Sequence, residues 1–495
     1  MAVSLPILAG PSAAPRPIMP KPAPVLPGPR ALPAAPANAR SPSVGLPLRF
    51  VLTGLAALAA GVALLIAWPD ILATYHYNQY VVAATHLFVL GFVCSVVMGA
   101  MYKLVPVALE VRLHSERLAK VQFIFHVIGV AGMVFMFWRW DLKQVGHFGS
   151  ALAFGVGLFV YNVARTLRRV PRWNVVAGGV TSALVWLSVT VLIGLSVAAA
   201  KCSYDSVERP GATNALGLLV RGLGAVAAYV NRFDPLAVMH THAHLGVVGF
   251  FLMMIVAVSF KLVPMFALSE LQNERRARWT VWLLNAGLAG LLVTLPARSP
   301  WRYGAVAALL AALVAYGLEL RAILRARNRR TLDWGLRYFL TAVSLLGPLA
   351  LLGAMLAWSG LRATALTTQL ENVYGLLGIL GVVTFTIMGF LYKIVPFLAW
   401  YHSYSRHIGR HKVPALADLY STRLQAIGYW LFLAGLLNAA VWTATGQARG
   451  VRFSCLLLAA SLALFAANMG QILSHFVRPR IGALAKVAPP AASLT

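Results

Sequence analysis

Twelve long apolar runs constrain the fold of this 495-residue chain more than any other feature. A helix needs about 20 residues to cross a bilayer, and each run is long enough to do so. The runs lie at 47–68, 81–107, 119–138, 146–165, 175–200, 237–265, 279–297, 303–324, 336–359, 373–399, 421–444 and 452–475. The sequence therefore predicts an all-α polytopic membrane protein with twelve transmembrane helices.

The composition agrees with a membrane protein and excludes several soluble classes. Hydrophobic residues make up 60% of the chain and charged residues 11%, whereas a soluble domain carries about 25% charged residues. A soluble enzyme, a disordered protein and a disulfide-rich secreted domain are excluded. The three cysteines, Cys94, Cys202 and Cys455, lie far apart and form no CxxC pair. They predict neither a disulfide framework nor a cysteine metal site.

The net charge of +29 comes from 42 Lys and Arg against 13 Asp and Glu. Cytoplasmic loops of membrane proteins are rich in basic residues, so the positive charge indicates how the chain is oriented in the membrane. We therefore predict no nucleic-acid partner. Basic clusters follow the even-numbered runs, as at Arg165, Arg168 and Arg169, while the loop 69–80 has no Lys or Arg. We expect both termini to be cytoplasmic, in an inner membrane of bacterial type.

The ends of the chain differ from its middle. Residues 1–46 are rich in Pro and Ala and predict a disordered cytoplasmic tail, and residues 478–495 are similar. The membrane domain is predicted to span 47–477. Between the fifth and sixth runs, the apolar segment 213–231 is interrupted by small and basic residues. It predicts an interfacial helix or a periplasmic excursion.

Three segments share one residue pattern, which predicts an internal repeat. A Gly lies five residues, and a Lys seventeen residues, after a common first position, and the Lys stands within an aromatic-Lys-aliphatic-Val-Pro sequence. The first position, Lys and Pro of the three copies are His86, Lys103 and Pro106; His244, Lys261 and Pro264; and Leu376, Lys393 and Pro396. These copies fall in runs two, six and ten. We therefore predict three four-helix repeats packed as a pseudo-threefold bundle.

The shared residues have structural explanations. The Gly lets neighbouring helices approach closely. The Lys, near the cytoplasmic end of its helix, can extend its ammonium group to water. The Pro is expected to end the regular helix at that interface.

The segment from Met239 to His244 is the most distinctive motif of the sequence. Residues four apart on a helix share a face, and residues two apart point in opposite directions. His240 and His244 are thus expected on one face and His242 on the other, so that one helix can serve two sites. Buried imidazoles need ligands or partners, so we predict metal or heme binding. The alternative is a hydrogen-bonded histidine cluster near the interface.

His86 occupies the repeat position equivalent to that of His244. Pseudosymmetry would place the two histidines at equal depth, facing a shared interior, which suits two axial ligands of one heme iron. The third copy has Leu376 instead. His147, near the start of the fourth run, is a further candidate ligand. His126 is expected to be a packed or hydrogen-bonded histidine.

These features resemble subunit I of the heme-copper oxidases, the superfamily of the cbb3-type cytochrome oxidases and nitric oxide reductases. The segment 241–249, with His242 and His244, looks like the pattern around their HxH heme ligands, and His86 matches their low-spin heme ligand. The resemblance implies low-spin, bis-His heme b on His86 and His244 or His242. It implies that the remaining histidines, including His240 and His147, hold a second heme or copper.

The resemblance also implies a role in electron transfer or in oxygen or nitric oxide reduction. The partners would be a c-type cytochrome or other electron-transfer subunits, because the chain has no CxxCH motif. The family takes its copper ligands from a His in span six and an adjacent His pair in span seven, and its HxH lies in span ten. Here 279–297 has no His and HxH lies in span six, so we expect a divergent member.

Two other functions remain open from the sequence. The chain is also similar to the NnrS proteins, twelve-span heme and copper proteins of the nitric oxide response, which would use the same histidines without turnover. A transporter or a structural membrane subunit is the third alternative, because internal repeats are common in transporters. The sequence itself assigns no catalytic residue.

Overall fold

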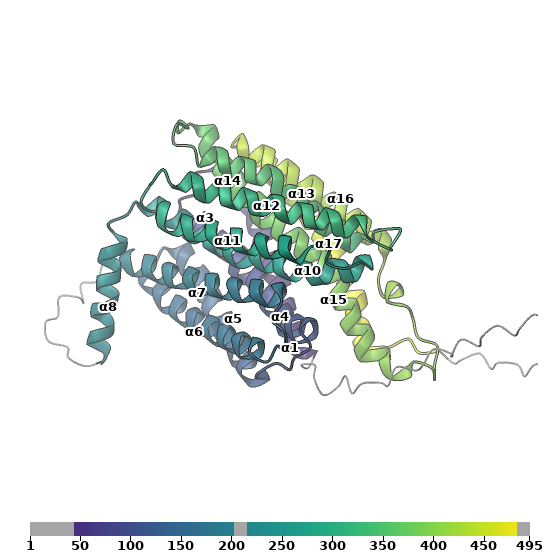
Figure 1. Cartoon of the computed structure of the whole chain (residues 1–495). Helices are drawn as coiled ribbons and strands as arrows, with labels where there is room; N and C mark the ends of the chain where they lie inside the picture. The colour runs from purple at the N-terminus through teal and green to yellow at the C-terminus, as the bar shows by residue number, and fades with distance from the viewer. Residues whose placement is uncertain (1–43, 202–214, 483–495) are drawn as a thin grey trace, which may run out of the picture. The chain divides into compact units, whose positions relative to one another are not determined.

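The computed structural model describes residues 44–201 and 215–482, and this described part of the chain is built from helices without strands. The chain divides into residues 1–39 and 40–495, and all described residues belong to the second unit. Of the predicted tails 1–46 and 478–495, residues 1–43 and 483–495 lie outside the described residues, as does Cys202. Figure 1 shows the order of the helices.

The helices of the first third of the fold are α1 (Gly45–Ala67), α2 (Asp70–Ala73), α3 (Gln79–His86), η2 (Leu87–Cys94), α4 (Ser95–Ala108), α5 (Glu116–Arg139) and α6 (Leu142–Leu167). The next are α7 (Val175–Lys201), α8 (Ala215–Val230), α9 (Pro235–His244), η4 (Leu245–Leu252), α10 (Met253–Ala267), α11 (Glu274–Thr294) and α12 (Arg302–Arg325). The last are α13 (Trp334–Leu356), α14 (Ala365–Leu376), η5 (Leu377–Thr384), α15 (Phe385–Tyr404), α16 (Thr422–Ala444) and α17 (Ala448–Val477).

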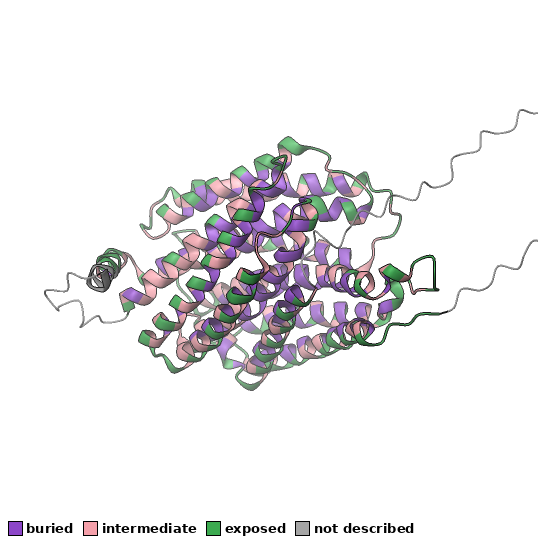
Figure 2. Cartoon of the chain, turned by 90° about the horizontal axis from the view of Figure 1, so that it is seen from below, coloured by how far each residue is buried: buried purple, intermediate pink, exposed green. Residues whose placement is uncertain are grey.

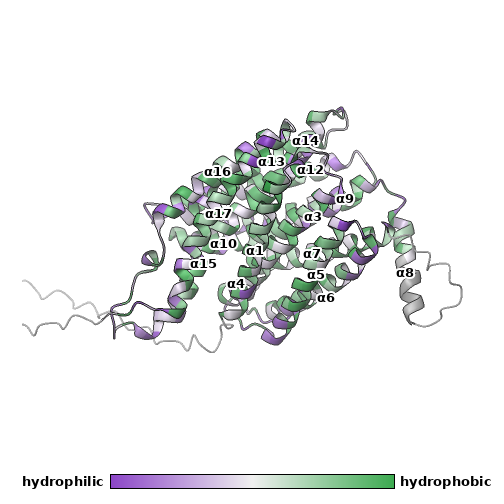
Figure 3. Ribbon diagram, turned by 180° about the vertical axis from the view of Figure 1, so that it is seen from behind, coloured by the Kyte–Doolittle hydropathy of each residue, from purple (hydrophilic) through white to green (hydrophobic). Residues whose placement is uncertain are grey.

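Within the described residues, eleven helices are long and apolar enough to cross a membrane. Figure 3 shows their apolar stretches, with hydrophilic residues gathered mainly at helix ends and loops. The twelve-span prediction is not confirmed, because α11, which covers most of the run 279–297, is not among the eleven. Its first two turns carry Glu274, Arg275, Arg276 and Arg278, which leave a shorter apolar stretch. The segment 213–231 contains α8, a 16-residue helix.

Neighbouring helices pack in the same way in each third of the chain. The hairpins α5–α6, α11–α12 and α16–α17 make the most extensive helix contacts. Similarly, α1 packs on α4, α7 on α10 and α13 on α15. Further contacts join α6 to α7, α12 to α13 and α17 to α1.

The three helices that carry the repeated motif form the interior. In the spans Pro235–Ala267 and Ala365–His407, 72% of the most apolar stretch is buried inside the protein. In the span Gln79–Ala108, 56% of that stretch is buried. The other eight candidate spans bury 17–39%, and Figure 2 shows exposed residues on their outer faces. Each interior helix also contains an eight-residue π-helix, and η5 contacts both η2 and η4. Such wide turns recur at functional sites.

The π-helices begin directly after His86, His244 and Leu376, the common first position of the repeat. Gly249, one of the repeated glycines, lies where a Cβ atom would come within 2.8 Å of the Trp186 Cβ on α7. The predicted close helix approach therefore occurs at this Gly. Because Gly249 has no side chain, η4 can pack directly on α7.

The predictions for the repeated Pro and Lys need correction. Pro106, Pro264 and Pro396 lie inside their helices, which continue to Ala108, Ala267 and Tyr404. A Pro removes a single backbone donor, and these helices continue past that loss. The three Lys also differ in environment. Lys103 is buried, Lys261 is exposed, and Lys393 binds the carboxylate of Asp333. Only Lys261 is therefore exposed in the way that we predicted for all three.

Candidate functional site

A cavity of about 600 Å³ lies among the interior helices. Its walls are mainly apolar, and Glu371 and Lys201 are the charged side chains among the described residues that line it. Six of the twelve histidines of the chain also line it: His76, His86, His126, His240, His242 and His244. A mainly apolar cavity with a few convergent polar groups is typical of a cofactor site.

Helix α9 carries three of these histidines, and its start is fixed by Asp234. The Asp234 carboxylate accepts a hydrogen bond from the Ala237 backbone N–H at 2.9 Å and lies 3.0 Å from the Arg298 guanidinium. The hydrogen bond from Ala237 and the Arg298 charge hold the pKa of Asp234 below its ordinary value. Pro235 stands in the first turn, where its missing N–H costs nothing.

The side chains of His86 and His242 face each other across the cavity. Their ring centres are 6.5 Å apart and the ring planes differ by 21°. In each ring Nδ1 lies against a backbone carbonyl: Val82 O at 2.8 Å for His86 and Thr190 O at 3.1 Å for His242. A carbonyl oxygen only accepts, so Nδ1 carries the proton in both rings and Nε2 keeps its lone pair.

The close approach of His242 to α7 depends on Gly194. A Cβ atom at this position would lie 2.9 Å from His242 Cε1. Real Cβ atoms do not approach that closely, so any larger residue would displace the imidazole. Gly194 therefore leaves the space that the His242 ring occupies beside α7.

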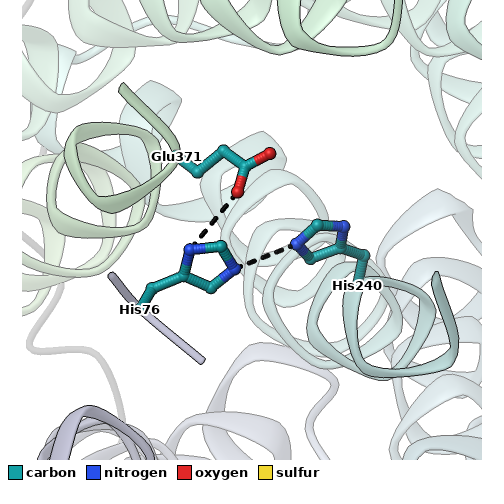
Figure 4. Close-up of side chains that lie close together, drawn as sticks. All are labelled: His76, His240 and Glu371. Atoms are coloured by element: carbon teal, nitrogen blue, oxygen red, sulfur yellow. Dashed lines mark hydrogen bonds and ion pairs between the residues drawn. The ribbon is translucent and has the colours of Figure 1, made fainter. Parts of the chain in front are cut away.

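His240 points to a different set of partners, shown in Figure 4. Its Nε2 lies 3.3 Å from His76 Nε2, and His76 Nδ1 lies 3.3 Å from Glu371 Oε2. The three residues come from α9, the α2–α3 loop and α14. Nitrogen and carboxylate oxygen atoms from all three lie within 4.8 Å of one another. Burial lowers the pKa of the His76 imidazole.

His244 lies one turn after His240 on α9 and also contacts α14. Its Nδ1 lies 2.7 Å from the His240 carbonyl oxygen, and its Nε2 lies 3.3 Å from the Tyr374 hydroxyl. His240 and His244 on α9 thus face Glu371 and Tyr374 on α14, in two successive turns. The predicted division of α9 into two faces agrees with these contacts, since His242 turns to α7.

Hydrogen bonds tie the His76 loop to α14. The Asn372 side chain donates to the Thr74 carbonyl at 2.6 Å, and the Gln369 side chain donates to the Ala73 carbonyl at 2.8 Å. Within the loop, the Asn78 side chain donates to the Tyr75 carbonyl at 2.6 Å and caps α3. These bonds fix the position of His76 relative to Glu371.

Two predicted histidines lie apart from these groups. His147 is exposed on α6 and is not among the cavity-lining residues, so the fold does not bring it to the other candidate ligands. His126 is buried and its Nε2 lies 2.9 Å from Ser95 Oγ. This contact agrees with the hydrogen-bonded role that we expected for His126.

Sequence reasoning assigned no role to His76, Glu371 or Tyr374. In the sequence, Glu371 is one of the two carboxylates nearest to the apolar runs, but its place toward the end of a run gave it no chemical role. His76 lies ten residues before His86, in the loop that lacks Lys and Arg. No local pattern links His76 to Glu371, because the fold alone brings these distant segments together.

Comparisons with known proteins match one part of the sequence and the fold as a whole. Residues 40–142 match the family model described as "Cytochrome C and Quinol oxidase polypeptide I". Among solved structures, the fold is similar to a heme-copper terminal oxidase dimer seen by cryo-electron microscopy, with a TM-score of 0.58 and 12% sequence identity. That match covers 91% of this chain and 89% of the other. No curated protein matches the chain.

The family match covers residues 40–142, and the structural likeness shows a similar helical fold, in agreement with the heme-copper oxidase resemblance seen in the sequence. The eleven long apolar helices among the described residues support a multi-pass membrane protein. The cavity residues fit a heme, because two half-buried imidazoles keep Nε2 lone pairs within mainly apolar walls. The family's copper ligands do not fit, because α11 has no histidine to supply the pair expected there.

Proposed function

We propose that this chain binds heme b and acts in electron transfer or in the reduction of oxygen or nitric oxide. The His86–His242 pair is the observation that carries the proposal. An iron between two imidazole nitrogens, at metal–nitrogen distances of about 2.0 Å, separates the ring centres by roughly 6 Å. The separation of 6.5 Å between these ring centres suits a low-spin, bis-His heme.

We assign His242, rather than His244, as the partner of His86. The His242 ring lies nearly parallel to that of His86, whereas His244 Nε2 meets the Tyr374 hydroxyl. His244 remains available to a second heme. His147 is exposed, and we assign it no ligand role.

The surrounding residues orient the two imidazoles and fix their tautomers. The carbonyls of Val82 and Thr190 accept the Nδ1 protons, which fixes the tautomer and the ring rotation. Gly194 leaves room for His242, and the apolar walls exclude water from both rings. A heme held in this way supplies one-electron transfer.

We also propose that α11 is the twelfth span and that the chain folds as three four-helix repeats. The recurrence of a π-helix directly after residues 86, 244 and 376 supports the repeat. So does the ring of contacts from α6 to α7, α12 to α13 and α17 to α1. The proposed location is a bacterial-type inner membrane with both termini cytoplasmic. The proposed partner is a c-type cytochrome or another electron-transfer subunit.

The missing His pair of α11 favours one alternative, a heme protein of the nitric oxide response that has no turnover of its own. The two functions share their heme ligands. Consumption of oxygen or nitric oxide by the chemically reduced, heme-loaded protein distinguishes them, because only a reductase consumes either gas catalytically.

The visible spectrum tests heme binding directly. Protein purified from heme-supplied cells should show the sharp α band of a low-spin heme in a reduced-minus-oxidised spectrum. We expect His86→Ala to abolish the band, because one axial ligand is lost. The control His147→Ala removes an exposed histidine and should retain it. A protein without heme would contradict the proposal and favour a transporter or structural subunit.

A further inference from the structure

We propose a non-heme metal site for a divalent first-row transition ion, formed by His76, His240 and Glu371. The site lies on the opposite side of α9 from His242 and shares no residue with the His86–His242 pair. It also differs from the copper site of the oxidase family, whose ligands come from spans six and seven. Figure 4 shows the three side chains converging from separate elements.

The distance between the two imidazoles fits a shared ion. Two nitrogens bound at about 2.0–2.1 Å to one tetrahedral ion lie roughly 3.3 Å apart. His76 Nε2 and His240 Nε2 are 3.3 Å apart. The nitrogen atoms therefore already have the separation that a common ion requires.

The hydrogen-bonding state of His76 also favours a metal. The alternative is a chain in which His240 donates to His76 and His76 donates to Glu371. His76 Nδ1, although 3.3 Å from Glu371 Oε2, is buried and has no aligned hydrogen-bond partner among the described residues. A buried polar nitrogen without a partner costs free energy, so the two imidazoles and Glu371 do not form a complete hydrogen-bond chain on their own.

The supporting hydrogen bonds hold the ligands before an ion arrives. Asn372 follows Glu371 on α14, and its amide donates to the Thr74 carbonyl, two residues before His76. It also donates to the Gln369 side chain at 2.9 Å. On the other side, Asp234 fixes the first turn of α9, which leads to His240. Such outer contacts orient metal ligands and contribute to affinity.

The donor set indicates the chemical class of the ion. Two imidazoles and one carboxylate, with coordination positions left open, are typical of non-heme Fe²⁺ and of Zn²⁺ sites. Soft ions that prefer sulfur are disfavoured, because no Cys belongs to the group. The group lines the cavity, so the open positions face space where water or a small molecule can bind.

Zinc titration of the chelator-treated, full-length protein in lipid nanodiscs tests the site. We expect one tight Zn²⁺ per chain in the wild type. Glu371→Gln and His76→Ala should each lower the affinity by tenfold or more, because a ligand is lost. Asn372→Leu should lower it about 10–100-fold through the loop position alone. His147→Ala should leave it unchanged.

Heme content, measured on the same samples, separates this inference from the proposed function. We expect all four variants to retain the heme band, which also shows that they are folded. Equal Zn²⁺ affinity in wild type, Glu371→Gln and His76→Ala would overturn the metal site while leaving the heme proposal intact. Tight Zn²⁺ binding by a protein without heme would support the metal site and contradict the heme proposal.

Discussion

The two sides of α9 place similar imidazoles in different settings. His242 meets His86 between interior helices, and both rings are held by carbonyls of helical residues. His240 meets His76, which lies in a short loop, and Glu371, which lies on a third element. The comparison shows that residues two apart on one helix can serve independent sites. Helix packing fixes one site, whereas side-chain hydrogen bonds to a loop fix the other.

Two independent sites should respond to different substitutions. A change in helix packing near His242 is expected to affect heme alone. A change in loop anchoring near His76 is expected to affect the metal alone. The predictions below use changes outside the ligands themselves, in order of decreasing effect.

Gly194→Ala should weaken heme binding most. The new Cβ would lie 2.9 Å from His242 Cε1, so the ring must leave its present position opposite His86. Overpacking of this kind costs about 1–3 kcal/mol, which corresponds to a loss of heme affinity of roughly 5- to 160-fold. Titration of the heme-free protein with heme measures this loss of affinity.

The matched control is Gly157→Ala on α6, where a Cβ atom has no neighbour within 4 Å. We expect normal heme affinity for this control and normal Zn²⁺ affinity for both variants. A Gly194→Ala protein with normal heme affinity would show that His242 is not an axial ligand.

Asp234→Ala should have a smaller effect, on stability. Loss of the Ala237 hydrogen bond at the start of α9 costs about 1 kcal/mol, and loss of the exposed contact with Arg298 costs less than that. Asp234→Asn retains an oxygen that can accept from Ala237 but loses the negative charge. The melting temperature should therefore fall more for the Ala variant than for the Asn variant at pH 7.

The effect of the Asp234 charge should depend on pH in a defined direction. The folded protein holds the pKa of Asp234 below its ordinary value, so the stabilisation is present above the unfolded-state pKa of about 3.9. It is lost as the pH falls through the folded-state pKa. The melting-temperature difference between wild type and Asp234→Asn should vanish in acid, and a constant difference would contradict the assignment.

The sequence predicted much of the fold because apolar length and repeat spacing are local signals. The histidine faces of α9 followed from helical periodicity, and the repeat positions coincide with the starts of three π-helices. The choice between His242 and His244 as the partner of His86 did not follow. That choice depends on which helix each ring meets, and Thr190 and Tyr374, which lie beside those rings, are far away in sequence.

The third repeat shows why the metal site was missed. Leu376 replaces the histidine of the other two copies, so the repeat pattern marks no ligand in this copy. Glu371 and Tyr374 instead lie five and two residues earlier on α14, where they face His240 and His244. The repeat pattern compares equivalent positions, so it cannot reveal side chains that contribute from different positions.

The most direct test measures heme and Zn²⁺ per chain in two variants of α9, His242→Ala and His240→Ala. Two independent sites predict a crossed result. His242→Ala loses the low-spin heme spectrum and keeps one tight Zn²⁺, whereas His240→Ala keeps the heme and loses the Zn²⁺. Loss of both groups in both variants, or retention of heme in His242→Ala, would contradict the division of α9 into two sites.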